Sequence, residues 1–345
     1  MERLGDEQIE RAVVVATETS LRWAGSSEWG NVRGEGSMSN PPVSIGLPVY
    51  NGENYLGEAI ESLRSQTFGD FELIISDNAS TDSTEDIARE AAGQDRRIRF
   101  YRQEVNAGGP ANYNFVLARA KSDDFFLWHA HDDLRAPESL ERSLQVMRDS
   151  PQASVVFSRA ALIGQSGEHL GVKPRPASLL SDRPHRRLRA VITSRHTDFV
   201  LFGLMRRHLL ERTDRHGSFK GGDRVLVAEM ALLGEFVEID ELLFLNRDHP
   251  DRYTRMPSDQ GMRQQKNAWW NPTSDEKISL PRWTGLARYL HAVRRHPLPR
   301  AEKARCYAAM GQALFDNRMY VSKQLIREIQ EAVPAAVVRV SPHRR

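Results

Sequence analysis

The run Phe125-Phe126-Leu127-Trp128-His129-Ala130-His131-Asp132-Asp133 governs how the rest of the sequence is interpreted. Its apolar first part is typical of a buried strand, and it ends in two adjacent carboxylates. Two neighbouring negative charges at the end of a buried strand repel each other and resist desolvation unless a cation or hydrogen-bond donors meet them. The run therefore predicts a site for a metal ion or a phosphate-bearing ligand at the end of a strand.

Short β-rich runs alternate with helical patterns on both sides of this run, which predicts βαβ units and a mainly parallel sheet. The other expected strands are 43–49, 71–76, 98–101, 155–157, 236–239 and 242–246. Helices are expected from the apolar spacing of Leu56, Ala59, Ile60 and Leu63, around 87–91, after Pro110, after Pro137, within 185–234 and after Pro281. The stretch 164–184 is rich in Gly, Ser, Pro and Arg and is expected to be a mobile loop.

Composition excludes several classes of protein. A chain of 345 residues with 40% hydrophobic content can bury a large core, and 48 Lys and Arg against 46 Asp and Glu give no bulk case for a nucleic-acid partner. One cysteine, Cys306, excludes zinc fingers and disulfide scaffolds and fits a reducing compartment. No apolar run approaches the roughly 20 residues that cross a bilayer. The short apolar patch at 12–16 lacks the basic flank of a secretory signal. We expect a soluble or peripheral protein in the cytoplasm.

Three polar loops should meet at one edge of the sheet, because the carboxyl ends of parallel strands lie along the same edge and ligands of open α/β sheets bind there. The loops are 50–53, 77–82 and 131–133. Their acceptors and small residues suit a nucleotide and its metal. One carboxylate of Asp132 and Asp133 could cap the helix near Pro137, but two exceed what a cap requires.

Other candidates carry two interpretations each. Asp82 is either a helix cap or part of the site, whereas Asp77 directly follows a strand and is placed to accept from a base or a ribose. Asp223 follows Gly221-Gly222, so it either caps a helix or acts as an accessible base. His249 lies in a loop and could contact a metal or phosphate. His129, His131 and Asp133 could form a metal corner, although His129 also fits a core position.

The arginines after residue 180 form solvated helix faces or, alternatively, a site for pyrophosphate or an anionic membrane. Trp269-Trp270 and Trp283 could stack on an acceptor or belong to the core. No G-x-G-x-x-G, G-x-x-x-x-G-K-[ST] or G-x-S-x-G pattern is present, so dinucleotide, P-loop and hydrolase-elbow functions lack their markers.

Taken together, these motifs resemble those of the inverting family 2 glycosyltransferases of the GT-A fold, in the bacterial branch that builds polysaccharides or decorates metabolites. The resemblance lies in 43–53, Gln66-Thr67-Phe68, 71–82, Asn106-Ala107-Gly108-Gly109 and His131-Asp132-Asp133 followed by Pro137. It implies an N-terminal extension over 1–40, a catalytic domain over 41–250 and a mostly helical C-terminal extension over 251–345. Within the domain, 41–150 would bind the nucleotide sugar and 151–250 the acceptor.

The resemblance also implies roles for individual residues. The expected nucleotide-sugar pocket comprises Pro48, Tyr50, Glu53, Asp77, Asn106, Gly109 and Asp132. Asp132 would hold Mg²⁺ or Mn²⁺ on the donor's diphosphate, with Asp133 and His249 as further metal contacts, and such hard cations suit carboxylate and phosphate oxygens. Asp223 would be the base that deprotonates an acceptor hydroxyl. Expected partners are a nucleoside-diphosphate sugar and a hydroxyl-bearing acceptor, with no nucleic acid; peripheral contact with the inner face of a membrane and a homodimer are left open.

One position departs from the family pattern. The first carboxylate of the usual Asp-x-Asp is replaced by Ala130, which leaves only Asp132 and Asp133. A metal-dependent hydrolase of phosphoesters or sugars, suggested by His129, His131 and Asp133, and a non-catalytic nucleotide-sugar-binding module, suggested by Ala130, are the alternative functions.

Overall fold

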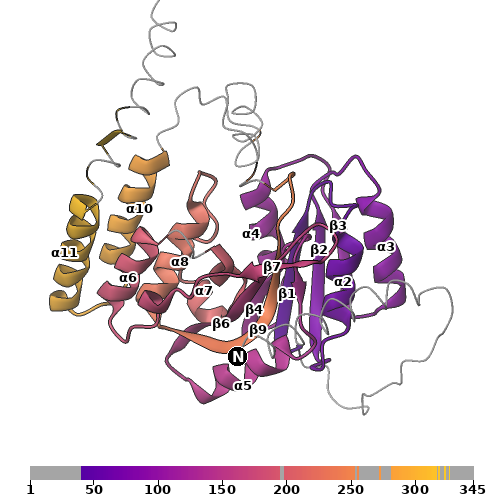
Figure 1. Cartoon of the computed structure of the whole chain (residues 1–345), viewed down its shortest axis with the longest axis horizontal. Helices are drawn as coiled ribbons and strands as arrows, with labels where there is room; N and C mark the ends of the chain where they lie inside the picture. The colour runs from indigo at the N-terminus through magenta and orange to yellow at the C-terminus, as the bar shows by residue number, and fades with distance from the viewer. Residues whose placement is uncertain are drawn as a thin grey trace, which may run out of the picture.

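A single mixed sheet forms the centre of the molecule (Figure 1). In the computed structural model, the described residues are 40–194, 198–252, 255, 272, 281–316, 318, 322–323 and 326. Their nine strands are β1 (Val43–Val49), β2 (Phe71–Asp77), β3 (Ile98–Arg102), β4 (Phe125–Trp128), β5 (Leu134–Arg135), β6 (Ala153–Ile163), β7 (His169–Val172), β8 (Leu204–Arg206) and β9 (Glu235–Arg247). The order is β3-β2-β1-β4-β8-β6-β9-β5, with β7 paired to β6.

The first half of the sheet is parallel, as expected. β1 lies between β2 and β4, and every residue of these three strands is buried. Helices cover both faces, which is why buried residues do not alternate with exposed ones along these strands. Gly46 in β1 permits a close helix contact, since a Cβ there would lie 2.6 Å from the Val116 side chain.

Two apolar cores lie on opposite faces of the sheet. The helices are α2 (Leu56–Arg64), α3 (Thr84–Gln94), α4 (Gly109–Arg119), α5 (Ser139–Asp149), α6 (Pro184–Thr193), α7 (Arg207–Leu210), α8 (Gly222–Leu233), α10 (Pro281–Arg295) and α11 (Arg300–Asp316). One core contains the apolar faces of α2, α3 and α5, and the other those of α4, α6, α8, α10 and α11. In Figure 1, α2 and α3 accordingly lie on the right and α6, α10 and α11 on the left.

The second half of the sheet differs from the expectation. The strand expected at 155–157 is part of a longer strand, β6. The stretch 164–184, expected to be a mobile loop, contains β7 and the 3-10 helix Ala177–Leu179. The two strands expected at 236–239 and 242–246 are one strand, β9, interrupted by a bulge. Asp240 and Glu241 occupy that bulge, because the register passes from Ile239 directly to Leu242 along β6.

Several of the arginines after residue 180 act inside the fold rather than as solvated charges. Arg206 donates to two carbonyls at the end of α5, at 2.7 and 3.0 Å, and Arg224 donates to the last carbonyls of α6. Arg187 donates to a carbonyl in the last turn of α8 at 2.9 Å. The final carbonyls of a helix have no partner within it, so a guanidinium there satisfies acceptors and complements the negative end of the helix dipole.

The expectations for 1–40 and for Trp269-Trp270 fall outside the described residues. Where a helix is described, none has the length and the apolar content that crossing a bilayer would need.

Candidate functional site

The polar loops after β1 and β2 and the segment after β4 meet at the carboxyl edge of the parallel strands, as expected. The amide of Asn51 donates to Ser80 Oγ at 2.9 Å, and that of Gly52 donates to Thr84 Oγ1 at 2.8 Å. A Cβ on Gly52 would lie 2.7 Å from the His131 ring, so this glycine allows the loop to approach the segment after β4. Asn51 and Ala79 have φ values of 48° and 61°, a strained conformation held by the surrounding contacts.

Asp77 is fully buried at the end of β2, and both of its oxygens have partners. Oδ1 accepts the Ser80 amide at 2.9 Å, and Oδ2 forms an ion pair with Arg102. Arg102 also donates to the Ser80 carbonyl at 2.9 Å. Asp77 and Arg102 together therefore hold the loop 77–82 in place.

Glu53 and Asp82 accept backbone amides at the start of α3. Glu53 Oε2 accepts the Ser83 amide at 3.0 Å, while Asp82 accepts the amides of Glu53 and Thr84, each at 3.1 Å. The hydrogen bonds to Asp82 outweigh its burial and lower its pKa. The N-cap residue of α3 is Ser83, and Asp82 before it accepts the amide of Thr84, the first residue of the helix.

Asn78 and Asn106 connect the second loop to the start of α4. The side-chain amide of Asn78 donates to Asn106 Oδ1 at 2.9 Å. The same oxygen accepts the backbone amide of Gly108 at 2.9 Å. Gly108 has a φ of 88°, which turns the chain into α4, where Gly109 is the first residue. The unsatisfied N–H groups of a helix start are therefore presented beside the loops.

Asp132 and His249 form a pair across the site. Oδ2 of Asp132 lies 2.9 Å from Nε2 of His249, and the side chain of Asp132 also lies 3.9 Å from Arg252. Burial alone would raise the pKa of Asp132, but the hydrogen bond to His249 and the charges of His131 and Arg252 hold it well below its usual range. Tyr55 packs on the His249 ring with centroids 4.7 Å apart.

Asp133 is oriented away from this pair. Its Oδ1 accepts from the Asn246 side chain and from the Arg247 amide, both at 2.9 Å, and its Oδ2 is buried without a hydrogen-bond partner. Burial and the charge of Asp132 raise its pKa. His129 is a core histidine, fully buried and 3.0 Å from the Asp133 carbonyl, with a pKa that burial holds low. The metal corner of His129, His131 and Asp133 is not assembled.

Arg247 binds the backbone of the segment that contains Asp132 and Asp133. It is completely buried, and it donates to the Asp132 carbonyl at 3.0 Å and to Gln165 O at 2.7 Å. The Nη2 atom of Arg247 forms an ion pair with Glu58 of α2 at 2.6 Å, and the same guanidinium lies over the Tyr55 ring. One side chain thus fixes Asp132 relative to α2 and to the loop after β6.

Asp223 lies in the first turn of α8 and is half-buried. Burial raises the pKa of Tyr113, and the charges of Asp132, Asp133 and Asp223 raise it further, which places all three carboxylates near its hydroxyl. The Tyr113 ring packs on His216 with centroids 5.1 Å apart. Asn114 exchanges two hydrogen bonds with the backbone of His216, at 2.9 and 3.0 Å, which ties this segment to α4.

The remaining expected site residues surround this centre. Pro48 is buried in β1, Tyr50 is exposed, and His131 is half-buried, with burial lowering its pKa. Among the residues that the structure describes, no group of three or more His, Cys, Asp and Glu side chains is arranged to hold a metal by itself. Asp132 and His249 can supply two metal ligands, and a bound diphosphate would have to supply others.

Sequence reasoning missed Tyr113, Asn114, His216 and Arg247. The motif Asn112-Tyr113-Asn114 follows the Gly108-Gly109-Pro110 turn after one residue, so its place at the start of a helix beside the site was a usable signal. No local pattern announces that Arg247 is buried.

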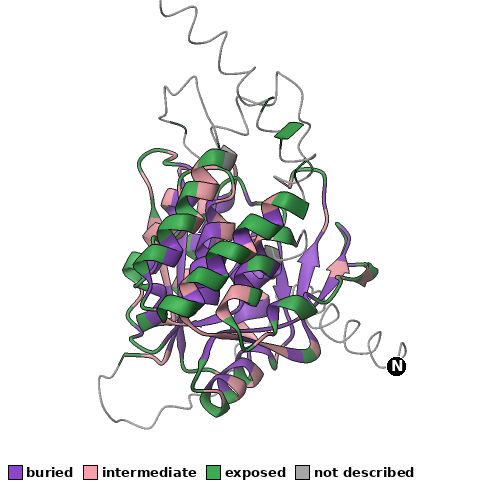
Figure 2. Ribbon diagram, turned by 90° about the vertical axis from the view of Figure 1, so that its left-hand side faces the viewer, coloured by how far each residue is buried: buried purple, intermediate pink, exposed green. Residues whose placement is uncertain are grey.

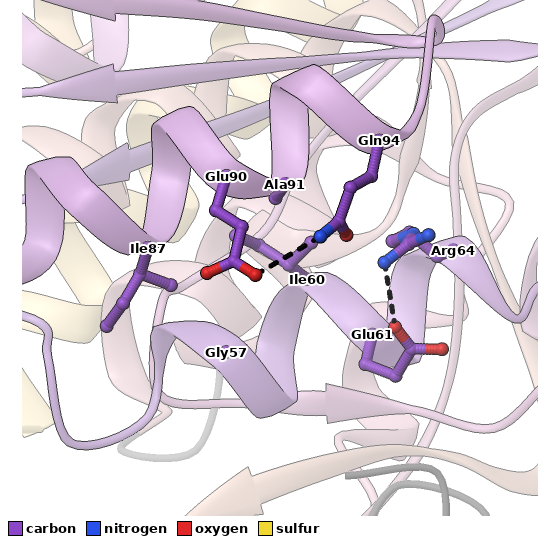
Figure 3. Close-up of a pocket in the computed structure, with 8 residues that line it drawn as sticks. All are labelled: Gly57, Ile60, Glu61, Arg64, Ile87, Glu90, Ala91 and Gln94. Atoms are coloured by element: carbon purple, nitrogen blue, oxygen red, sulfur yellow. Dashed lines mark hydrogen bonds and ion pairs between the residues drawn. The ribbon is translucent and has the colours of Figure 1, made fainter. Parts of the chain in front are cut away.

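A groove of about 230 Å³ lies between α2 and α3 and shares no residue with this site (Figure 3). Ile60, Ile87 and Ala91 form its apolar lining, and Glu61 and Arg64 form an ion pair at 3.3 Å at its edge.

Comparison with known proteins gives consistent matches. Residues 44–214 match the model of Glycosyl transferase family 2. An uncharacterized glycosyltransferase of Rickettsia typhi is 35% identical over 137 residues, which are 39% of this chain and 42% of that protein. The putative glycosyltransferase EpsE of Bacillus subtilis is 36% identical over 130 residues, which are 37% of this chain and 46% of EpsE.

Among solved structures, S. aureus TarS in complex with UDP-GlcNAc aligns with a TM-score of 0.50 and 18% identity, covering 79% of this chain and 80% of that chain. This likeness confirms the α/β fold of the GT-A type. The chain spans less than half the length of the two curated relatives.

Proposed function

Because the chain belongs to glycosyl transferase family 2, we propose that it moves a sugar, with inversion, from a nucleoside-diphosphate sugar to a hydroxyl acceptor. The observation that supports this proposal is that Asp132 and Asp223 both lie close enough to Tyr113 for their charges to raise the pKa of its hydroxyl. An inverting displacement needs a binding group for the leaving diphosphate on one side of the sugar and a base on the other. Separate elements supply the two carboxylates, since Asp132 follows β4 and Asp223 lies in the first turn of α8.

On the donor side, Asp132 and His249 would hold Mg²⁺ or Mn²⁺. Their nearest atoms are 2.9 Å apart, which is about the spacing of two adjacent ligands in an octahedral site with bonds of about 2.1 Å. When bound, the cation would neutralise charge on the departing nucleoside diphosphate. Asp133 supports the site by fixing the segment to Asn246, rather than as a direct metal ligand.

The nucleotide would lie over the loops after β1 and β2. Tyr50 is exposed there, and the start of α4 with Gly109 presents backbone N–H groups suited to phosphate oxygens. Asp77 would face the base, although Ser80 and Arg102 already hold its oxygens. A base contact at Asp77 would therefore exchange one of these partners. Glu53 and Asn106 would shape the pocket through the loops that they fix.

On the acceptor side, Asp223 would remove the proton from the acceptor hydroxyl. That oxygen forms the new bond to the anomeric carbon as the bond to the diphosphate oxygen breaks, and the proton stays on the Asp223 carboxylate. Asp223 follows Gly221 and Gly222 in the first turn of α8 and is only half-buried, so an acceptor hydroxyl can reach its carboxylate.

Turnover with a panel of UDP- and GDP-sugars and simple glycoside acceptors, with and without Mn²⁺, tests the proposal. We expect Asp223→Asn to lower kcat by about 10²- to 10⁴-fold, the usual contribution of a general base, while donor binding is retained. Glu211→Gln, an exposed carboxylate outside the site, is the matched control and should leave kcat unchanged. Full activity of Asp223→Asn would refute the base assignment.

The two alternative functions separate in the same assay. The metal-dependent hydrolase loses its ligand set, because His129 is in the core and Asp133 is held by Asn246. The non-catalytic module, suggested by Ala130, predicts donor binding with neither transfer nor hydrolysis for any acceptor.

A further inference from the structure

Positive charge is concentrated in α6, α10 and α11. Of the 48 Lys and Arg residues in the chain, ten lie in these three helices, whereas only two of the 46 Asp and Glu residues do. The rest of the chain therefore has more acidic than basic residues. Such asymmetry between parts of a nearly neutral chain indicates an anionic partner for the basic part.

Part of this charge is used within the fold, and part is free for a partner. Arg288 and Arg295 form ion pairs with Asp214, and Arg189 pairs with Asp316. Arg186, Arg294 and Arg300 are exposed and form no ion pair among the described residues.

Exposed apolar side chains lie on the same helices. Trp283 and Leu290 of α10, and Tyr307 and Phe315 of α11, are 41% to 64% exposed. Spacings of seven and eight residues place each pair on one side of its helix. Of the ten exposed large hydrophobic residues in the described part of the chain, five lie beyond residue 280. Figure 2, which turns the left side of Figure 1 toward the viewer, shows exposed stripes along the helices on this side.

The buried side of α10 reaches the acceptor side of the site. Tyr289 packs against the core there, and burial together with the charge of Asp223 raises its pKa to about 12. Tyr289 therefore places α10 next to the proposed base in α8, while Trp283 and Leu290 of the same helix are exposed to solvent.

We propose that the face formed by α6, α10 and α11 binds the surface of an anionic lipid bilayer. Exposed Trp, Leu, Tyr and Phe side chains beside unpaired arginines are the composition of helices that lie in a membrane interface. A second copy of the chain fits less well, because a twofold contact would bring two positively charged faces together. Nucleic acid would match the arginines but leave the exposed Leu290 and Phe315 without a role.

The experiment is flotation of the full chain with vesicles of phosphatidylcholine alone and of phosphatidylcholine with 30% phosphatidylglycerol. We expect binding to the anionic vesicles only, weakened in 1 M salt, since salt screens exposed charges. Arg294→Glu with Arg300→Glu should lower partitioning roughly tenfold or more, because each basic residue near an anionic surface contributes about fivefold. Trp283→Ala with Phe315→Ala should also lower it. Arg148→Glu, an exposed arginine on α5, is the matched control and should bind like wild type.

Several outcomes would overturn the proposal. These are absence of wild-type binding to anionic vesicles, equal binding of the Arg294 and Arg300 variant, or a response to Arg148→Glu of the same size. Tighter binding to duplex DNA than to vesicles would reassign the face to nucleic acid, and a dimer that these substitutions abolish would reassign it to a second copy. The proposal is independent of the proposed function, since vesicle binding is measured without donor or acceptor. All substituted side chains are exposed, so an unchanged Tm verifies folding.

Discussion

Strands β1, β2 and β4 are buried at every residue and lie in parallel register, whereas β6, β8 and β9 include antiparallel pairings and carry arginines that reach across to other elements. In the first half, a loop of six residues and then a helix follow each of β1, β2 and β3. In the second half, Arg206 reaches from β8 to α5, and Arg247 reaches from β9 to α2. The proposed donor side belongs mainly to the first half and the proposed base to the second. The site is therefore built on the junction between the parallel half and the mixed half of the sheet, the second of which adds long polar contacts to its apolar packing.

The largest loss of stability should follow from a cavity in the parallel half. Leu73 is fully buried in β2, so Leu73→Ala should lower the free energy of unfolding by about 2–5 kcal/mol. Urea denaturation measures this loss, which should depend little on salt. Leu170→Ala on β7, where the side chain is about half exposed, should cost less than about 0.5 kcal/mol. A similar loss for both variants would remove the contrast between packed and exposed leucines.

A polar contact should matter nearly as much in the second half. Arg247→Met should cost about 2–4 kcal/mol, because it leaves the Asp132 and Gln165 carbonyls without their donor and breaks the pair with Glu58. Arg148→Met is the exposed control. A neutral result for Arg247→Met in urea denaturation would mean that apolar packing, rather than polar contacts, also holds the second half.

The contact between α6 and α11 should depend on pH. Burial alone would raise the pKa of Glu302, but hydrogen bonds from His185 and Arg305 lower it to about 2. A lowered carboxyl pKa stabilises the fold above the unfolded pKa of about 4.3, and this stabilisation is lost as pH falls toward 2. Glu302→Gln should therefore cost about 1–2 kcal/mol at pH 7 and progressively less in acid. Urea denaturation of the wild type and of Glu302→Gln between pH 7 and pH 3 measures the difference in their free energies of unfolding. A difference that stays constant with pH would contradict the assignment.

The smallest effect should come from Asp82, which accepts backbone amides just before α3 in the first half. Asp82→Ala removes the acceptor for the Glu53 and Thr84 amides, so it should cost about 1 kcal/mol. Asp82→Asn keeps an acceptor oxygen and should cost less. Thermal unfolding of both variants provides the measurement, and an equal loss for both would show that the charge, rather than the hydrogen bonds, is what stabilises the loop.

The same contrast explains what the sequence could predict. The strand at 43–49 and the apolar face of Leu56 to Leu63 were predicted with the observed positions, because burial imposes a local pattern on strands and helices. β5 and β8 have two and three residues and exist only through pairing with distant strands, so no local pattern encodes them. The bulge at Asp240 and Glu241 divided β9 into two expected strands, since charged residues interrupt the apolar run.

For the site, the approach of the three loops was predictable from the edge rule for parallel strands. The pairing of Asp132 with His249 joins residues 117 positions apart, and the burial of Arg247 depends on α2, so both need the tertiary structure. The sequence placed Asp132 and Asp133 together as metal candidates, whereas the structure separates them: Asp132 faces His249, and Asp133 binds Asn246.

The central claim is that Asp132 binds the donor and Asp223 drives the transfer. Calorimetric titration of the active nucleotide sugar with Mn²⁺ into the wild type, Asp132→Asn and Asp223→Asn tests it directly. The account predicts that Asp132→Asn loses donor binding in Mn²⁺, while Asp223→Asn binds with the wild-type Kd and fails only in turnover. Wild-type donor binding by Asp132→Asn, or loss of donor binding in folded Asp223→Asn, would contradict it.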